Sequence, residues 1–151
     1  MKLPLQILEQ QIRIIKESPQ IRVLLSALMS AATWFCWAYW ANHEHPHHAL
    51  VSGLSQGGVS FTTTFVGTFL LEVLYVRLGS TLWGRASGAA IVSGLSLSFM
   101  ITVHTLAHTP NMVMTILPVF AVVVVYCGSY IYGLHKIKTQ NESDAVEVAS
   151  S

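Results

Sequence analysis

The chain has 151 residues, of which 52% are hydrophobic and only 10% are charged, with a formal net charge of +1. Soluble domains carry about 25% charged residues, so this composition excludes an ordinary water-soluble domain and predicts a protein embedded in a lipid bilayer. The eight Lys and Arg residues are scattered in ones and twos, which argues against a nucleic-acid partner because phosphate binding requires a basic patch.

The N-terminal segment, residues 1–18, predicts an amphipathic helix on the cytoplasmic surface of the membrane. Leu5, Leu8, Ile12 and Ile15 recur at helical spacing, and charged residues occupy positions between them. A helix packed on a partner, or on the cytoplasmic ends of the protein's own spans, would show the same pattern. Both interpretations stay open.

Four long apolar runs follow, and each exceeds the roughly 20 residues that cross the hydrocarbon core as a helix. They cover residues 21–41, 50–78, 82–107 and 112–134. Turn-forming residues at 79–80 and 109–111 separate the later runs by short connections, which favour antiparallel neighbours. The sequence therefore predicts an all-α integral membrane protein, in which residues 19–137 form an up-down bundle of four transmembrane helices.

The positive residues predict the orientation of the chain. They lie before or at the very start of the first run, around the turn between the second and third runs, and after the fourth run: Lys2, Arg13, Lys16, Arg22, Arg77, Arg85, Lys136 and Lys138. The connections 42–49 and 108–111 contain none. The positive-inside rule therefore places both termini in the cytoplasm and these connections outside, in a plasma membrane, which is the inner membrane in a bacterium.

Aromatic residues cluster near the ends of the runs and predict interfacial belts. Trp34, Trp37, Tyr39 and Trp40 gather at the outer end of the first run, and Trp83, Tyr126, Tyr130 and Tyr132 lie toward the inner ends of the third and fourth. The alternative is that they are ordinary packing residues. The large residues of the first run also stand where a signal peptide carries small cleavage-site residues, so this run is expected to be retained.

Residues 138–151 differ in composition from the spans. They are polar, acidic and rich in Ser. A segment with so few apolar residues cannot bury enough surface to fold alone, so we expect a disordered cytoplasmic tail.

A polar ridge runs along the second span. Its members recur every four residues: Ser52, Gln56, Ser60, Thr64, Thr68 and Glu72. The expected partner is the third span, which is rich in Gly and Ser, and the pairs Gly53/Gly57 and Gly84/Gly88 would allow close helix packing. Two interpretations remain open, because small and hydroxyl residues serve packing in many membrane proteins and also line hydrated pathways.

Glu72 is an acidic residue inside the second span, about two helical turns from its cytoplasmic end. A carboxylate at this depth is costly unless it is paired or protonated. Folding the second and third spans about the turn at 79–80 brings Arg85 to a similar depth, so the sequence predicts a charge pair between Glu72 and Arg85. The alternatives are a carboxylate that reaches water and a titratable group that couples proton movement to transport.

The predicted outer face is rich in histidine. It carries His43, His45, His47, His48, His104 and His108. The last two are four residues apart and share a helix face, a spacing that suits ligands of Zn or Cu. No HExxH motif or closed cysteine set accompanies them, so a solvated, pH-sensitive histidine loop is the competing interpretation.

Three functions fit these patterns. The least demanding is an accessory or assembly subunit of a larger membrane complex, docked through small-residue helix faces. The alternative is a small homo-oligomeric transporter or channel with a polar path along the second and third spans. The third is a metal-binding or metal-sensing membrane protein. The chain lacks a catalytic motif such as a Ser/His/Asp order or a phosphate-binding loop, so no enzymatic activity is expected.

Overall fold

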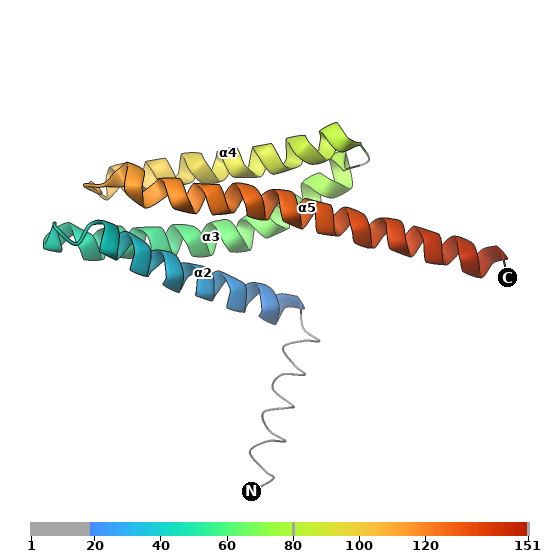
Figure 1. The fold of residues 1–151 in the computed structure, drawn as a ribbon, viewed down its shortest axis with the longest axis horizontal. Helices are drawn as coiled ribbons and strands as arrows, with labels where there is room; N and C mark the ends of the chain where they lie inside the picture. Colours follow the sequence, from blue (N-terminus) through green and yellow to red (C-terminus); the bar gives the residue numbers. More distant parts are fainter. Residues whose placement is uncertain (1–18, 80, 151) are drawn as a thin grey trace, which may run out of the picture.

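The structure is a computed structural model that describes residues 19–79 and 81–150, and these residues form four long helices (Figure 1). They are α2 (Pro19–Ala41), α3 (Pro46–Leu78), α4 (Leu82–Leu106) and α5 (Met112–Ser150). Each contains a segment long and apolar enough to cross a membrane, which confirms the four predicted spans by length and composition. The predicted N-terminal helix, residues 1–18, lies outside the described residues.

Successive helices are joined at alternate ends of the molecule (Figure 1). The connections 42–45 and 107–111 share one end, which we call the histidine end, and the connection 79–81 lies at the other, which we call the arginine end. α3 packs against both α2 and α4, and α5 packs chiefly against α4. α2 meets α5 over a small area and diverges from it toward the arginine end (Figure 1).

The second span begins earlier than the sequence predicts. α3 starts at Pro46 rather than at residue 50, because proline is pre-organised for the first helical position and has no N–H to leave unbonded there. His47 and His48 therefore belong to the first turn of α3. The predicted histidine loop is reduced to a tight connection.

Local contacts explain where α4 begins and ends. The hydroxyl of Thr81 accepts a hydrogen bond from the backbone N–H of Gly84 at 3.0 Å and caps the helix. A Cβ atom on Gly84 would collide with the carbonyl of Leu78, so the glycine allows α4 to start against the end of α3. Beyond the other end of α4, His108 adopts a φ of 49°, the left-handed conformation that often follows a helix.

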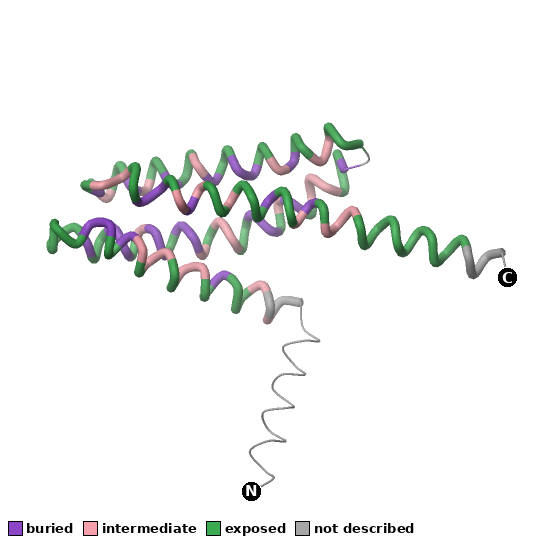
Figure 2. The backbone as a smooth tube through the Cα atoms, viewed as in Figure 1, coloured by how far each residue is buried: buried purple, intermediate pink, exposed green. Residues whose placement is uncertain are grey.

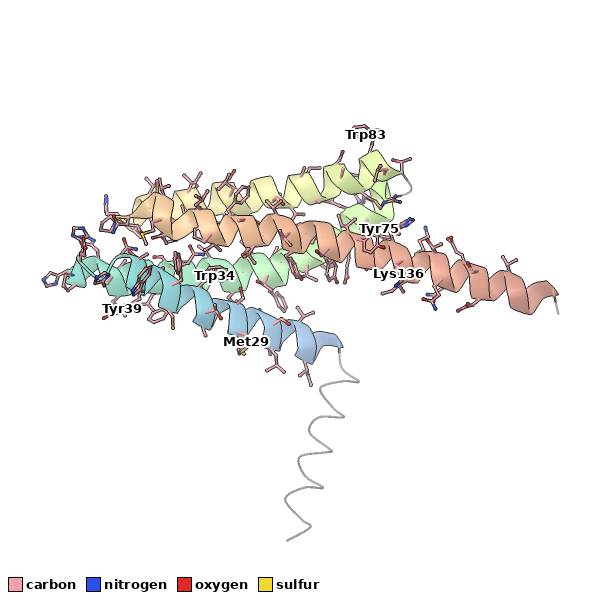
Figure 3. All side chains as sticks on the ribbon, in the orientation of Figure 1. Met29, Trp34, Tyr39, Tyr75, Trp83 and Lys136 are labelled. Atoms are coloured by element: carbon pink, nitrogen blue, oxygen red, sulfur yellow. The ribbon has the colours of Figure 1, made fainter. Side chains whose placement is uncertain are left out.

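The apolar core of the described residues is small. One cluster contains Val59, Met100, Ile116 and Val119, and another contains Leu71, Val92, Cys127 and Ile131. Figure 2 shows buried residues confined to the inner sides of the helices, while the outer sides are exposed. Trp83 is 82% exposed and points away from the bundle (Figure 3). An outer surface this apolar suits contact with lipid rather than water.

The glycine pairs allow close packing, but at different places from those expected. A Cβ on Gly53 would lie 3.0 Å from the Phe35 ring, and one on Gly57 would lie 3.2 Å from the Ala31 carbonyl oxygen, so this pair faces α2. Gly84 serves the α3–α4 connection. A Cβ on Gly88 would meet Leu74 and Ile131 only at ordinary contact distance.

A proline inside α5 is matched by a tryptophan on α2. Pro118 has no N–H, so the carbonyl of Met114 loses its usual helical partner. The indole Nε1–H of Trp37 donates to this carbonyl oxygen at 3.2 Å. Because an unbonded carbonyl in hydrocarbon costs several kcal/mol, this contact stabilises α5 and holds α2 against it.

The C-terminal segment differs from the predicted disordered tail. α5 continues without interruption to Ser150. Contacts one turn apart support this extension: Lys138 and Glu142 form an ion pair at 3.9 Å, and the Thr139 hydroxyl donates to the His135 carbonyl oxygen at 3.0 Å. Composition alone suggested disorder, but the segment continues a helix that is already nucleated, so each added residue needs little further stabilisation.

Candidate functional site

A buried histidine lies at the centre of a hydrogen-bonded cluster near the histidine end. His104, in the last turn of α4, is 0% exposed. Its Nε2 lies 2.6 Å from Oε1 of Gln56 on α3, and its Nδ1 lies 2.8 Å from Oγ1 of Thr109. Ser52 donates to Thr109 at 3.3 Å, and Gln56 Nε2 donates to Ser60 at 3.0 Å. These five buried side chains, which we call the His104 chain, form one row of hydrogen bonds.

The amide of Gln56 sets the direction of the His104 chain. Its Oε1 can only accept, so His104 donates the proton on Nε2. In the neutral imidazole Nδ1 is then an acceptor, and the Thr109 hydroxyl donates to it. All donors therefore point from Ser52 toward Ser60. The Ser60 hydroxyl accepts from Gln56, and among the described residues no acceptor takes its own proton.

Ser60 lines a cavity of about 180 Å³ between the four helices. Hydroxyl-bearing side chains in its wall are Ser26, Ser30, Ser60, Thr63, Thr64, Ser96 and Tyr126. The remaining wall is apolar and consists of Trp34, Gly67, Leu71, Val92, Val119, Val122, Val123 and Cys127. None of these wall residues carries a charge. The His104 chain therefore leads from the histidine end into an uncharged cavity whose wall carries several hydroxyl groups.

Two tyrosines of α5 continue the polar groups toward the arginine end. The Thr68 hydroxyl donates to the Thr64 carbonyl oxygen at 2.6 Å, so Tyr126 is the donor in its 2.7 Å contact with Thr68. The Tyr130 hydroxyl donates to Oε1 of Glu72 at 2.7 Å. The two tyrosine ring centroids are 5.7 Å apart. Polar side chains thus follow one another from Ser52 to Glu72, with the cavity between the two hydrogen-bonded stretches.

Glu72 and Arg85 have partners other than each other. The Glu72 carboxylate accepts from Tyr130, whereas Arg85 Nη1 donates to the Gly79 carbonyl oxygen at 3.3 Å and lies 3.4 Å from His135 Nδ1. In the described part of the chain no salt bridge joins the predicted pair. Both residues lie near the arginine end as expected, but equal depth does not bring two side chains together when their helices present them in different directions.

The partners of the polar ridge come from three helices. Gln56 meets His104 on α4, the expected partner span. Thr64 donates to Ser30 on α2 at 3.3 Å, and Thr68 and Glu72 accept from tyrosines on α5. From Ser52 to Thr68 the ridge therefore faces the interior of the whole bundle rather than one neighbouring helix, whereas Glu72 at its end is exposed.

The outer-face histidines do not converge. His104 is buried in its hydrogen-bonded chain, whereas His43, His45, His47, His48 and His108 are exposed. Nδ1 of His43 lies 2.7 Å from the Trp40 carbonyl oxygen. Within residues 19–79 and 81–150, no group of three or more His, Cys, Asp or Glu side chains is arranged to hold a metal ion. The predicted Zn or Cu site thus gains no support from the geometry.

A second buried polar cluster, centred on Asn42, joins α2 to α5 and was not singled out from the sequence. The Asn42 amide donates to the Ala38 carbonyl oxygen at 2.8 Å and to the Thr115 hydroxyl at 2.9 Å, and its Oδ1 accepts from the backbone N–H of Asn111 at 2.9 Å. Asn111 returns a bond to the Ala41 carbonyl oxygen at 2.8 Å. The sequence feature that could have indicated this cluster is an asparagine in each connection at the histidine end, Asn42 and Asn111.

The aromatic residues divide into two groups. Tyr39, Trp40, Trp83 and Tyr132 are exposed at the positions expected of interfacial belts. Tyr39 and Trp83 point outward in Figure 3. Trp34, Trp37, Tyr126 and Tyr130 instead contribute to the cavity wall or to hydrogen bonds between helices. Clustering near the span ends does not distinguish these roles, because both occur at the same depth.

No protein-family model, curated protein or solved structure that was compared with this chain matches it.

Proposed function

We propose that this protein is a small transporter or channel, and that a small polar species crosses the bilayer along the polar side chains from Ser52 to Glu72. The observation that carries the proposal is the His104 chain, which leads from the histidine end to Ser60 and the cavity. Helix packing in a membrane can be achieved with small residues alone. Here the bundle instead buries an imidazole and an amide that are hydrogen-bonded to each other, and polar groups buried within a membrane commonly mark a pathway.

The two hydrogen-bonded stretches have different roles in this proposal. The cavity is the midpoint, and the His104 chain is the route from the histidine end. Thr68, Tyr126 and Tyr130 form the route to the arginine end, and this route ends at the exposed carboxylate of Glu72. Positive-inside orientation puts the histidine end outside and the arginine end in the cytoplasm, in a plasma membrane or bacterial inner membrane. Because α2 diverges from α5, we further propose a homo-oligomer whose neighbouring copy covers this side.

The proposal is tested with purified protein reconstituted into liposomes. Two rates are measured: the decay of a pH gradient reported by an entrapped dye, and the swelling of vesicles in gradients of glycerol, urea and mannitol. We expect at least one rate to exceed that of protein-free liposomes. Ser60→Ala removes the last hydroxyl of the His104 chain with little change in shape and should lower that rate about tenfold, which corresponds to about 1.4 kcal/mol.

The matched control is Thr62→Val on the same helix. Thr62 is exposed, and its hydroxyl donates only to the Gly58 carbonyl oxygen of its own helix at 2.9 Å. Its substitution should leave the rate unchanged. If liposomes with wild-type protein match protein-free liposomes in both measurements, the protein is not a transporter of these species and the proposal fails.

An accessory or assembly subunit is the second candidate, and one feature of α4 favours it. Small residues recur every four positions on its outer side: Ala86, Ala90, Gly94, Ser98 and Thr102, all exposed. Nothing lies within 4 Å of a Cβ placed on Gly94. Small-residue stripes of this kind allow another transmembrane helix to approach closely. Purification in mild detergent with mass determination separates the candidates, because co-purifying membrane proteins favour the subunit and a homo-oligomer without partners favours transport.

A further inference from the structure

The cavity has two chemically different sides. Most of its hydroxyl groups come from α2 and α3, including those of Ser30, Ser60 and Thr64. The side formed by α5 is mainly apolar and includes Val119, Val123 and Cys127. An occupant that matches both sides carries hydrogen-bonding groups along one edge and C–H groups along the other.

The volume of the cavity and the lack of charge in its wall limit further which molecules can occupy it. A cavity of about 150 Å³ holds a molecule as large as benzene, so the 180 Å³ volume accommodates a solute of similar or slightly larger size. The exposed wall residues Val122 and Tyr126 leave the cavity partly open, which gives such a solute a way in. No charged side chain lines the wall, and an ion would lose its hydration without gaining a counter-charge. The occupant is therefore small and uncharged.

Ser60 supplies the specific contact. It is only 2% exposed and lines the cavity, and the direction of the His104 chain leaves its hydroxyl proton free to be donated. A buried donor is costly until it is matched by an acceptor. We infer that the cavity binds a small uncharged solute with a hydroxyl or carbonyl oxygen that accepts from Ser60, of which a short polyol is the simplest example. This inference rests on the proposed function, since it names the class of solute that the path carries.

Cys127 provides a direct readout, because its side chain lines the cavity and is 1% exposed. In a Cys36→Ala variant it is the remaining thiol, and its labelling by methyl methanethiosulfonate can be followed by mass spectrometry. We expect glycerol at twice its dissociation constant to slow labelling about threefold, because two thirds of the sites are then occupied and only the free third can react. Mannitol at the same osmolarity should have no effect, because it is too large for the cavity. Ser60→Ala should remove most of the protection by glycerol.

The control is Cys127→Ala, in which Cys36 on the exposed side of α2 is labelled and should not respond to glycerol. Equal effects of glycerol and mannitol on Cys127, or no effect of either, would overturn the inference. Protection by decanol but not by glycerol would show that an acyl chain is the occupant. If the liposomes show proton flux but glycerol does not protect Cys127, the proposed function stands and this inference fails. If glycerol protects Cys127 but neither flux is observed, the binding site is supported and the proposed function fails.

Discussion

Asn42 connects three parts of the histidine end through a single amide. It bonds to the end of α2, to the backbone at Asn111 and to Thr115 on α5, and it is completely buried. Replacement by Leu keeps the number and branching of the side-chain heavy atoms but leaves the Asn111 N–H without its acceptor. An unsatisfied buried group costs about 1–3 kcal/mol. We therefore expect Asn42→Leu to lower the Tm of the purified protein clearly, as measured by tryptophan fluorescence in detergent.

His47→Leu is the comparison for this substitution, since His47 lies close by in the chain but is exposed in the first turn of α3. Its Tm should stay near that of the wild type. If the two variants unfold at the same temperature, the Asn42 cluster does not hold α2 to α5. The role of Asn42 could not be predicted from the sequence, because its partners lie about 70 residues away and depend on how α2 and α5 are rotated.

At the scale of the helices, the α2–α3 contact depends on the absence of a side chain at Gly53. A Cβ there would be 3.0 Å from the Phe35 ring and 3.2 Å from its carbonyl oxygen, and the backbone atom cannot move aside without shifting the helix. Gly53→Val should destabilise the protein by about 1–3 kcal/mol, the usual cost of overpacking. Gly58→Val is a close control, because nothing lies within 4 Å of a Cβ at that position. Similar denaturation midpoints for both variants would contradict tight packing at Gly53.

How well each helix boundary could be predicted from the sequence depends on the property that defines that boundary. Apolar length located the four spans, and glycine or proline marked the connections. The start of α3 was missed because Pro46 and the histidines after it are polar or helix-breaking by composition, yet suit a first turn. The partner of Glu72 was missed for another reason. Depth along α3 and α4 suggested Arg85, but the rotation of α5 brings Tyr130 to the carboxylate instead.

For the whole molecule, the distribution of positive residues predicts one orientation, with the histidine end outside. In a background with Cys36 and Cys127 replaced by Ala, a cysteine introduced at exposed His47 should react with a membrane-impermeant maleimide on intact cells. A cysteine at exposed Lys138 should react only after the membrane is permeabilised. The opposite pattern would reverse the orientation and exchange the two ends of the proposed path.

The length of α5 has a mechanical consequence. Its 39 residues make a rod about 58 Å long, nearly twice the thickness of the hydrocarbon core of about 30 Å. The rod has no break after Pro118, so its last turns move with the part that lines the cavity. A tilt of about 10° about the Met112 end displaces the far tip by roughly 10 Å. α5 therefore acts as a lever, because a small rearrangement around the cavity produces a large displacement at its C-terminal end. Spectroscopic distance measurements between the C-terminal end of α5 and the end of α4 at the arginine end can resolve this displacement.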